Sequence, residues 1–250
     1  MNKWDSNAYL KFINERTRPS KDLINRLSNH KNILDIGSGP GNSTNELYKR
    51  YLNASIIGAE ADDSMISKAK TNYPNLKFEK AFMPNDFNKF GKFDLIFSNA
   101  CIHWIKEQEA IFNEIYNHLE IDGEVAIQIP LTQNADFYKM LYGLIDSKYN
   151  ELKNIDNFHN LDKYGYYNLL NKIGFKNIEI WETTYIHHVN TSDDIIAWYS
   201  GSGLKPYLDK VIDKDMFIND LKELINKNYT KLDDGTYFLL MPRLFFVANK

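Results

Sequence analysis

The chain is poor in several features that mark particular classes of protein. It has a single cysteine, Cys101, among 250 residues, so it can form neither an intramolecular disulfide nor a cysteine-based zinc site. Such cysteine usage is typical of a reducing compartment, and we expect a cytoplasmic protein. No apolar run approaches the roughly 20 residues that a membrane-spanning helix needs, and the first residues lack the apolar stretch of a signal peptide. Membrane attachment is therefore not expected.

The chain also lacks net positive charge. Its formal net charge at pH 7 is -3, and its isoelectric point is about 6.1. Sequence-independent nucleic-acid binding depends on basic groups that neutralise phosphates. We therefore do not expect a nucleic-acid partner.

Arginine is scarce as well. Of 30 lysine and arginine residues, only five are arginine: Arg16, Arg18, Arg26, Arg50 and Arg243. A chain that mostly uses lysine places arginine selectively, and a guanidinium group binds a carboxylate through two parallel hydrogen bonds. Arg16 and Arg18 lie together in a predicted loop before the first helix, whereas Arg243 lies in an apolar final strand. Either these three bind a carboxylate substrate, or Arg16 and Arg18 form surface pairs with Glu15 or Asp22 and Arg243 bridges two loops.

The rest of the composition is that of an ordinary globular protein, so we expect a single domain over residues 1–250. Predicted strands cover residues 32–36, 55–60, 76–81, 93–98, 124–129, 177–187 and 236–248. Predicted helices cover residues 22–28, 42–51, 64–71, 107–118, 134–149 and 162–173, with a further helical block at 192–228. This alternation predicts an α/β fold with a mainly parallel, seven-stranded, Rossmann-like sheet and helices on both faces.

Two segments, about 131–160 and 190–232, are too long to be simple connections and have helical patterns. Long insertions of this kind commonly carry function. We expect them, with the N-terminal segment 1–30, to form a helical lid over a substrate site at the open end of the sheet.

A glycine-rich corner follows the first predicted strand. The strand ends at Gly37, Gly39 and Gly41 and is followed by a helix, an arrangement in which main-chain amides and a helix N-terminus can approach a nucleotide. The dinucleotide fingerprint requires a third glycine three positions after the second, where this chain has Asn42. The corner therefore favours S-adenosylmethionine over NAD, and a nicotinamide oxidoreductase is the weaker alternative.

Polar residues follow the neighbouring strands. Glu60 ends the second strand and can accept hydrogen bonds from both ribose hydroxyls; alternatively it caps a helix or faces water. Asp35 lies on a buried strand and needs a partner. It can anchor the glycine turn through backbone amides, or accept from the methionyl ammonium group through water. Asn99, at the end of the fourth strand, suits the amino-acid end of S-adenosylmethionine.

With these motifs, the chain resembles the class I S-adenosylmethionine-dependent methyltransferases, and within them it is similar to the trans-aconitate methyltransferase family. The similarity covers nearly the whole chain. It includes the glycine corner and C-terminal segments that the wider superfamily does not share, at 166–167, 181–185, 203–206 and 242–245. The resemblance implies a class I methyltransferase fold and O-methylation of trans-aconitate, or of a closely related small polycarboxylate. The products are a monomethyl ester and S-adenosylhomocysteine.

The resemblance and the residue types together predict two sets of contacts. The predicted cofactor-binding residues are Asp35, Gly37, Ser38, Gly39, Glu60, Ala61, Phe82, Met83, Asn99 and Ala100. The predicted substrate-binding residues are Tyr9, Arg16, Arg18, His103, Trp104, Lys205 and Arg243. The basic residues would hold the carboxylates that do not react, while Tyr9, His103 and Trp104 would shape the reacting end. For His103 and Trp104, packing in the core is the alternative.

No metal site and no catalytic general base are predicted. A carboxylate with a pKa of about 4 is already ionised near neutral pH, so formation of an ester by methyl transfer requires no proton acceptor. Catalysis would depend on the alignment of the reacting atoms and on the exclusion of water.

Three positions depart from the family pattern. Phe82 stands where the family has an aspartate that accepts from the adenine amino group; Phe82 can instead pack on the adenine, with Asp86 or a backbone carbonyl accepting that hydrogen bond. His103 replaces a glutamine and introduces a group that can become charged. Lys205 replaces an arginine, so that a point charge takes the place of a planar fork.

Two other functions fit the same motifs. The first is methylation of a different carboxylate, such as a malonyl thioester. The second is a non-catalytic protein that binds S-adenosylmethionine. In either case we expect a small-molecule partner and a monomer or weak homodimer.

Overall fold

The computed structural model describes residues 12–155 and 158–250. The chain divides into two compact units. The sheet unit comprises Ile13–Pro130, Phe158–Thr183 and Arg243–Lys250. The helical unit comprises Met1–Phe12, Leu131–Asn157 and Thr184–Pro242, of which residues 12, 131–155 and 184–242 are described.

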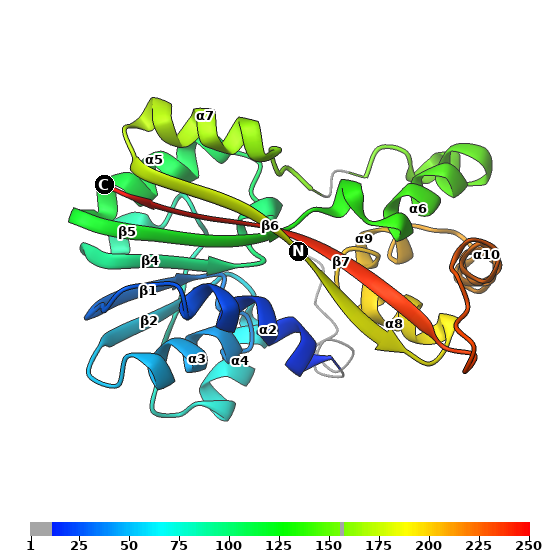
Figure 1. Ribbon diagram of the computed structural model, residues 1–250, viewed down its shortest axis with the longest axis horizontal. Helices are drawn as coiled ribbons and strands as arrows, with labels where there is room; N and C mark the ends of the chain where they lie inside the picture. Colours follow the sequence, from blue (N-terminus) through cyan, green and yellow to red (C-terminus); the bar gives the residue numbers. More distant parts are fainter. Residues whose placement is uncertain (1–11, 156–157) are drawn as a thin grey trace. The chain divides into compact units, whose positions relative to one another are not determined.

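The described residues form a seven-stranded sheet in the order β3-β2-β1-β4-β5-β7-β6 (Figure 1). The strands are β1 (Asn32–Ile36), β2 (Ser55–Glu60), β3 (Lys77–Lys80), β4 (Phe93–Asn99), β5 (Leu119–Pro130), β6 (Lys176–Val189) and β7 (Tyr237–Asn249). The first five strands pair in parallel, and β7 is antiparallel to β5. β1 is buried over its last four residues, as expected for a parallel strand covered on both faces. The predicted fold class is confirmed.

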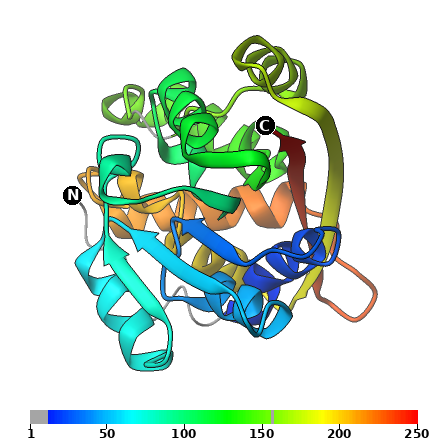
Figure 2. The same ribbon diagram turned by 90° about the vertical axis from the view of Figure 1, so that its left-hand side faces the viewer.

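Helices cover both faces of the sheet unit. They are α2 (Ile13–Ile24), α3 (Asn42–Arg50), α4 (Asp63–Asn72), α5 (Gln108–His118) and α7 (Lys163–Ile173). Figures 1 and 2 show α2, α3 and α4 on one face and α5 and α7 on the other. Contacts of β7 agree with this arrangement, because successive residues of a strand point to opposite faces of the sheet. Phe246 contacts Phe112 of α5 and Tyr166 of α7. The preceding residue, Phe245, points to the other face and stacks on Trp181.

The first helix differs from the prediction. A helix at 22–28 with a preceding loop is wrong, because α2 begins at Ile13 and carries both Arg16 and Arg18. Pro19 lies inside the helix, where a proline removes a backbone hydrogen bond. However, Pro19, Leu23 and Ile24 are buried, so packing on the sheet unit outweighs the lost backbone hydrogen bond.

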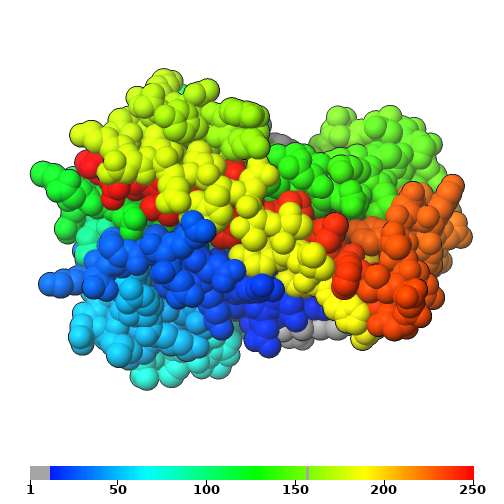
Figure 3. Space-filling view, in the orientation of Figure 1, coloured from blue at the N-terminus to red at the C-terminus, as the bar shows by residue number. Residues whose placement is uncertain are grey.

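On the face that α2 covers, Arg26 joins the N-terminal segment to β6. Its guanidinium lies 4.2 Å from the centre of the Trp181 ring, and it lies 3.4 Å from the Glu179 carboxylate. The space-filling view shows the blue residues of this segment against the yellow residues of β6 (Figure 3). Arg26 therefore has a structural role on the surface.

The helical unit has an aromatic core. Its helices are α6 (Asp136–Lys148), α8 (Ser192–Ser200), α9 (Lys205–Leu208) and α10 (Lys214–Asn228). Phe137 of α6 stacks on Tyr199 of α8 with 3.8 Å between ring centres, and Phe217 of α10 meets Tyr149 edge-on at 4.8 Å. Most of 131–160 and all of 190–232 belong to this unit.

Short 3₁₀ turns complete the described elements: η1 (Phe87–Lys89), η2 (Ile102–Trp104), η3 (Thr132–Asn134) and η4 (Asn150–Leu152). Within the ranges 12–155 and 158–250, none of the helices has both the length and the apolar character needed to cross a membrane.

Candidate active site

The glycine corner connects β1 to α3. A side chain at Gly37 would collide with Cys101, and one at Gly41 would collide with Tyr73 and Phe78. Gly39 differs, because no described atom lies within 4 Å of the place where its Cβ would be. Its φ of 54° is in the region that favours glycine. The corner thus leaves open space at Gly39, where a ligand can approach the backbone.

Glu60 closes one side of this space. Its Oε2 accepts a hydrogen bond from the Gly39 amide at 2.9 Å, and its Oε1 accepts from the Ala61 and Asp62 amides at 2.8 and 2.9 Å. Asp62, rather than Glu60, caps α4, so the helix-cap interpretation of Glu60 is wrong. Burial raises the pKa of Glu60, and the backbone amides oppose that shift. Oε1 already accepts two hydrogen bonds, whereas Oε2 accepts one and retains a lone pair for a further donor.

Asp35 is fully buried beneath the corner. Its Oδ2 accepts from the hydroxyls of Ser43 and Thr44, both at 2.7 Å. The expectation that backbone amides of the glycine turn hold Asp35 is therefore wrong, since hydroxyls of the first turn of α3 do so. Burial raises the pKa of Asp35 to about 6, although both hydroxyls lower it. Among the described residues, neither Asp35 Oδ1 nor the buried Ser38 Oγ has a hydrogen-bond partner.

Phe82 lies at the same edge of the sheet, just beyond β3, with 37% of its surface exposed. Its amide donates to Asp86 Oδ2 at 2.8 Å, and Lys89 Nζ lies 3.0 Å from the same oxygen. These contacts lower the pKa of Asp86. Since Asp86 already binds two donors, the exposed ring of Phe82 is the better candidate for contact with an adenine. Two other predicted cofactor residues, Ala61 after Glu60 and Met83 after Phe82, are partly buried.

The segment after β4 carries the next predicted residues. Asn99 ends β4, and Ala100 adopts a φ of 55° and donates its amide to the carbonyl of Gln128 at 2.8 Å. The chain then turns through η2, which contains His103 and Trp104. Both rings meet Phe158, with ring centres 5.6 Å away for His103 and 4.9 Å away for Trp104.

His103 is an uncharged group in this structure. It is 2% exposed, and burial together with the nearby positive charge of Arg243 lowers the pKa of its imidazole to about 3. The expectation that His103 introduces a group that can become charged is therefore wrong.

The three selected arginines all belong to the sheet unit. Arg243 pairs with Pro130 across β7 and β5 and is 7% exposed, so this arginine of the last strand is buried. Arg16 is partly buried and Arg18 is exposed, both on α2. Arg243 lies two residues before Phe245 and therefore shares the face of the sheet that α2 covers.

Lys205 and Tyr9 are the other two predicted substrate residues. Lys205 belongs to the helical unit, where its Nζ lies 2.9 and 2.8 Å from the two carboxylate oxygens of Asp209. Tyr9 lies outside the described residues. Their roles in substrate binding stay predictions.

Sequence reasoning missed Gln128. This residue is fully buried near the carboxyl end of β5, and neither its Oε1 nor its Nε2 has a hydrogen-bond partner within the described ranges. The available signal was a long polar side chain in the otherwise apolar run Val125–Ile129.

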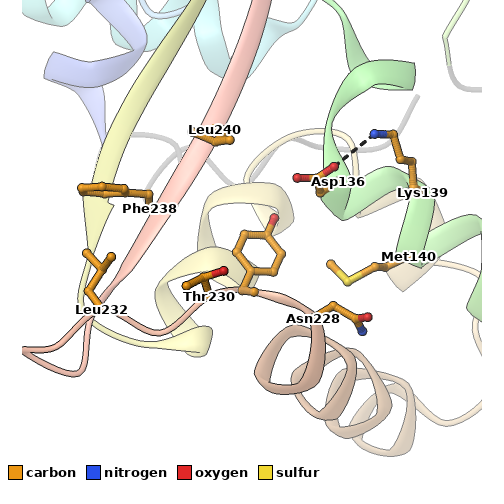
Figure 4. A pocket seen from close by; sticks show the side chains of 9 residues that line it. Asp136, Lys139, Met140, Asn228, Thr230, Leu232, Phe238 and Leu240 are labelled. Atoms are coloured by element: carbon orange, nitrogen blue, oxygen red, sulfur yellow. Dashed lines mark hydrogen bonds and ion pairs between the residues drawn. The ribbon is translucent and has the colours of Figure 1, made fainter.

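The helical unit has a hollow of its own (Figure 4). It has a volume of about 530 Å³ and is lined mainly by α6, the chain after α10 and β7. Asp136 and Lys139 form an ion pair at its rim, 3.1 Å apart. Of the predicted site residues that the structure describes, none lines it. In the described part of the chain, no three histidine, cysteine or acidic side chains are grouped so that they could hold a metal ion.

Comparison with known proteins identifies the family. The family model described as "Methyltransferase domain" matches residues 27–174. A trans-aconitate 2-methyltransferase of Agrobacterium fabrum is 32% identical, with 99% of each chain covered. An Escherichia coli trans-aconitate 2-methyltransferase is 29% identical over all of this chain and 99% of its own.

The chain belongs to the trans-aconitate 2-methyltransferase family. Solved structures agree on the fold of this methyltransferase. The YcgJ protein of Bacillus subtilis superposes with a TM-score of 0.60 at 14% identity, covering 95% of this chain and 98% of the other. A putative methyltransferase from Bacillus halodurans gives a TM-score of 0.56 at 13% identity, with coverage of 95% and 98%.

Proposed function

We propose that this chain is an S-adenosylmethionine-dependent O-methyltransferase that forms a monomethyl ester of trans-aconitate. Full-length similarity to relatives with that name supports the substrate class. The observation that carries the proposal is Arg243, a buried cation beside an uncharged His103 in the same unit as the glycine corner. A guanidinium group binds carboxylates through two parallel hydrogen bonds, and a polycarboxylate offers several carboxylates to this cation.

The corner fits the cofactor. Open space at Gly39, the remaining lone pair of Glu60 Oε2 and Asp35 Oδ1, which has no hydrogen bond within the described residues, provide acceptors for a ribose hydroxyl and for an ammonium group. Phe82 offers an apolar surface for the adenine, and Asn99 and Ala100 border the methionyl end. Bound S-adenosylmethionine supplies a methyl group on a positively charged sulfur and is released as S-adenosylhomocysteine.

The chain's own contribution is binding and orientation. Trans-aconitate is ionised at neutral pH, so no residue needs to accept a proton. Arg243, with Arg16 and Arg18 of α2, would hold the carboxylates that do not react through charge-assisted hydrogen bonds. His103 stays neutral and adds no positive charge where the nucleophilic carboxylate lies, which preserves its reactivity.

The helical unit is proposed to act as the lid. It contains the two long insertions and Lys205, and a lid that excludes water would strengthen the electrostatic interactions of the bound anion. We also propose that the protein acts in the cytoplasm as a monomer or weak homodimer, without nucleic acid. Light scattering at several concentrations tests the oligomeric state.

A product test decides the function. Purified protein is incubated with methyl-labelled S-adenosylmethionine and, separately, trans-aconitate, cis-aconitate, citrate and a malonyl thioester, and products are identified by mass spectrometry. A labelled monomethyl ester formed fastest from trans-aconitate supports the proposal. Labelling of the malonyl thioester alone would assign the alternative substrate. Cofactor binding without transfer to any acid would indicate a non-catalytic binding protein.

A further inference from the structure

Gln128 has the environment of a ligand-binding group that the protein itself does not satisfy. It is completely buried, and within the described residues both ends of its amide are without a hydrogen bond. Buried amides are almost always hydrogen-bonded, because leaving one unsatisfied destabilises the fold. By contrast, Gln108, also buried, donates to the Ile102 and Ile105 carbonyls and accepts from the Tyr166 hydroxyl.

The sheet register places Gln128 among the polar residues of the site. Asn99 of β4 is its register partner on one side, and Phe245 of β7 is its partner on the other. Register partners share one face of the sheet, and here Phe245 shows that it is the α2 face. Arg243 is the diagonal neighbour across the β5–β7 pair, a relation that corresponds to about 7–8 Å between such residues. A long arginine side chain spans this distance.

Two other polar side chains also have atoms without a hydrogen bond. Among the described residues, Asn99 Oδ1 and His103 Nδ1 are buried without a hydrogen-bond partner. Asn99 is the register partner of Gln128, and burial together with the positive charge of Arg243 lowers the pKa of His103. A small anion with several oxygens fits the donors of this set, because carboxylate oxygens can accept from Arg243 and from Gln128 Nε2 at once.

We propose that the Gln128 side-chain amide binds the carboxylate that receives the methyl group, while Arg243 binds a neighbouring carboxylate of the same molecule. This inference rests on the proposed function. The chemistry favours such a division, because an arginine on the reacting carboxylate would hold its negative charge and make it a poorer nucleophile. A neutral N–H donor fixes its orientation without a full opposing charge.

Two variants test the role of Gln128. Gln128→Met keeps the length of the side chain and removes both polar ends. Gln128→Glu keeps the shape and places an anion where the substrate carboxylate would lie. Calorimetry measures the binding of trans-aconitate in the presence of S-adenosylhomocysteine, and separately the binding of S-adenosylmethionine alone. Steady-state kinetics then give kcat and KM for each variant.

We expect Gln128→Met to weaken trans-aconitate binding by about 10- to 100-fold, the effect of losing a hydrogen bond to a charged group. Gln128→Glu should weaken it further, since like charges repel. The affinity for S-adenosylmethionine should change less than about twofold, and kcat should fall with both variants.

Thermal unfolding separates this role from a structural one. Gln128→Met removes an unsatisfied buried amide and should not lower the melting temperature, whereas the matched Gln108→Met variant removes satisfied hydrogen bonds and should lower it.

If Gln128→Met bound trans-aconitate as the wild type does, the inference would be overturned and the proposed function would stand. An equal loss of S-adenosylmethionine binding would assign Gln128 to the cofactor and overturn it too. If the wild type bound no polycarboxylate, the proposed function itself would fail.

Discussion

Asp35 offers the sharpest test of how this site is built, because its effects on stability and on binding should have opposite signs. Burial raises its pKa from 3.8 to about 6. Above pH 6 the folded protein therefore holds a carboxylate that would ionise more easily in the unfolded chain. One pKa unit corresponds to about 1.4 kcal/mol, so the ionised form costs the fold about 3 kcal/mol.

The sign follows from proton counting. Between pH 3.8 and 6 the folded state binds more protons at Asp35 than the unfolded state does. This contribution to stability therefore falls as pH rises through that window and is constant above it. Asp35→Asn removes the titration but keeps an acceptor oxygen for the Ser43 and Thr44 hydroxyls.

We expect Asp35→Asn to unfold at a higher temperature than the wild type at pH 8, by as much as about 10 °C for a protein of this size. The gap should shrink as the pH approaches 4. The same variant should bind S-adenosylmethionine more weakly, because it loses the negative acceptor for an ammonium group. Differential scanning fluorimetry from pH 4 to 8 and calorimetry give both quantities.

Thr44→Val is the matched control. It removes one hydroxyl that lowers the Asp35 pKa, so it should destabilise the protein, most clearly at pH 8. An Asp35→Asn variant that melts below the wild type at pH 8, or a gap that is the same at pH 5 and pH 8, would refute the reasoning.

Three further predictions concern the neighbouring groups. Arg243→Met should raise KM for trans-aconitate about 10- to 100-fold and raise the pKa of His103, because the arginine charge lowers it; nuclear magnetic resonance titration measures that shift, and an unchanged imidazole would contradict it. Gly39→Val should abolish S-adenosylmethionine binding by filling the open space, whereas Gly91→Val, also built into open space, should leave binding intact in the same calorimetric assay. Cys101 should resist iodoacetamide at pH 8, since burial raises the pKa of its thiol, and rapid labelling seen by mass spectrometry would count against this.

Local patterns in the sequence determined most of the fold. The strand at 32–36 and the strand at 55–60 are found with the predicted bounds, because a parallel strand buried on both faces is a short apolar run with turn residues at its ends. The predicted end of the helix at residue 173 is also confirmed, where Gly174 follows with a φ of 112°. The scarcity of arginine in the sequence also indicated Arg243 as a candidate site residue.

What the sequence could not determine depends on neighbours that are distant along the chain. Packing keeps α2 helical through Pro19, and a turn of α3 supplies the hydroxyls that hold Asp35. Burial and the charge of Arg243, which lies 140 positions later in the chain, together lower the pKa of His103. Gln128 becomes a neighbour of Asn99 and Phe245 only when β4 and β7 pair with β5 on either side. Periodicity and turn chemistry act over a few residues, whereas desolvation and cross-strand contacts exist only once the strands have come together.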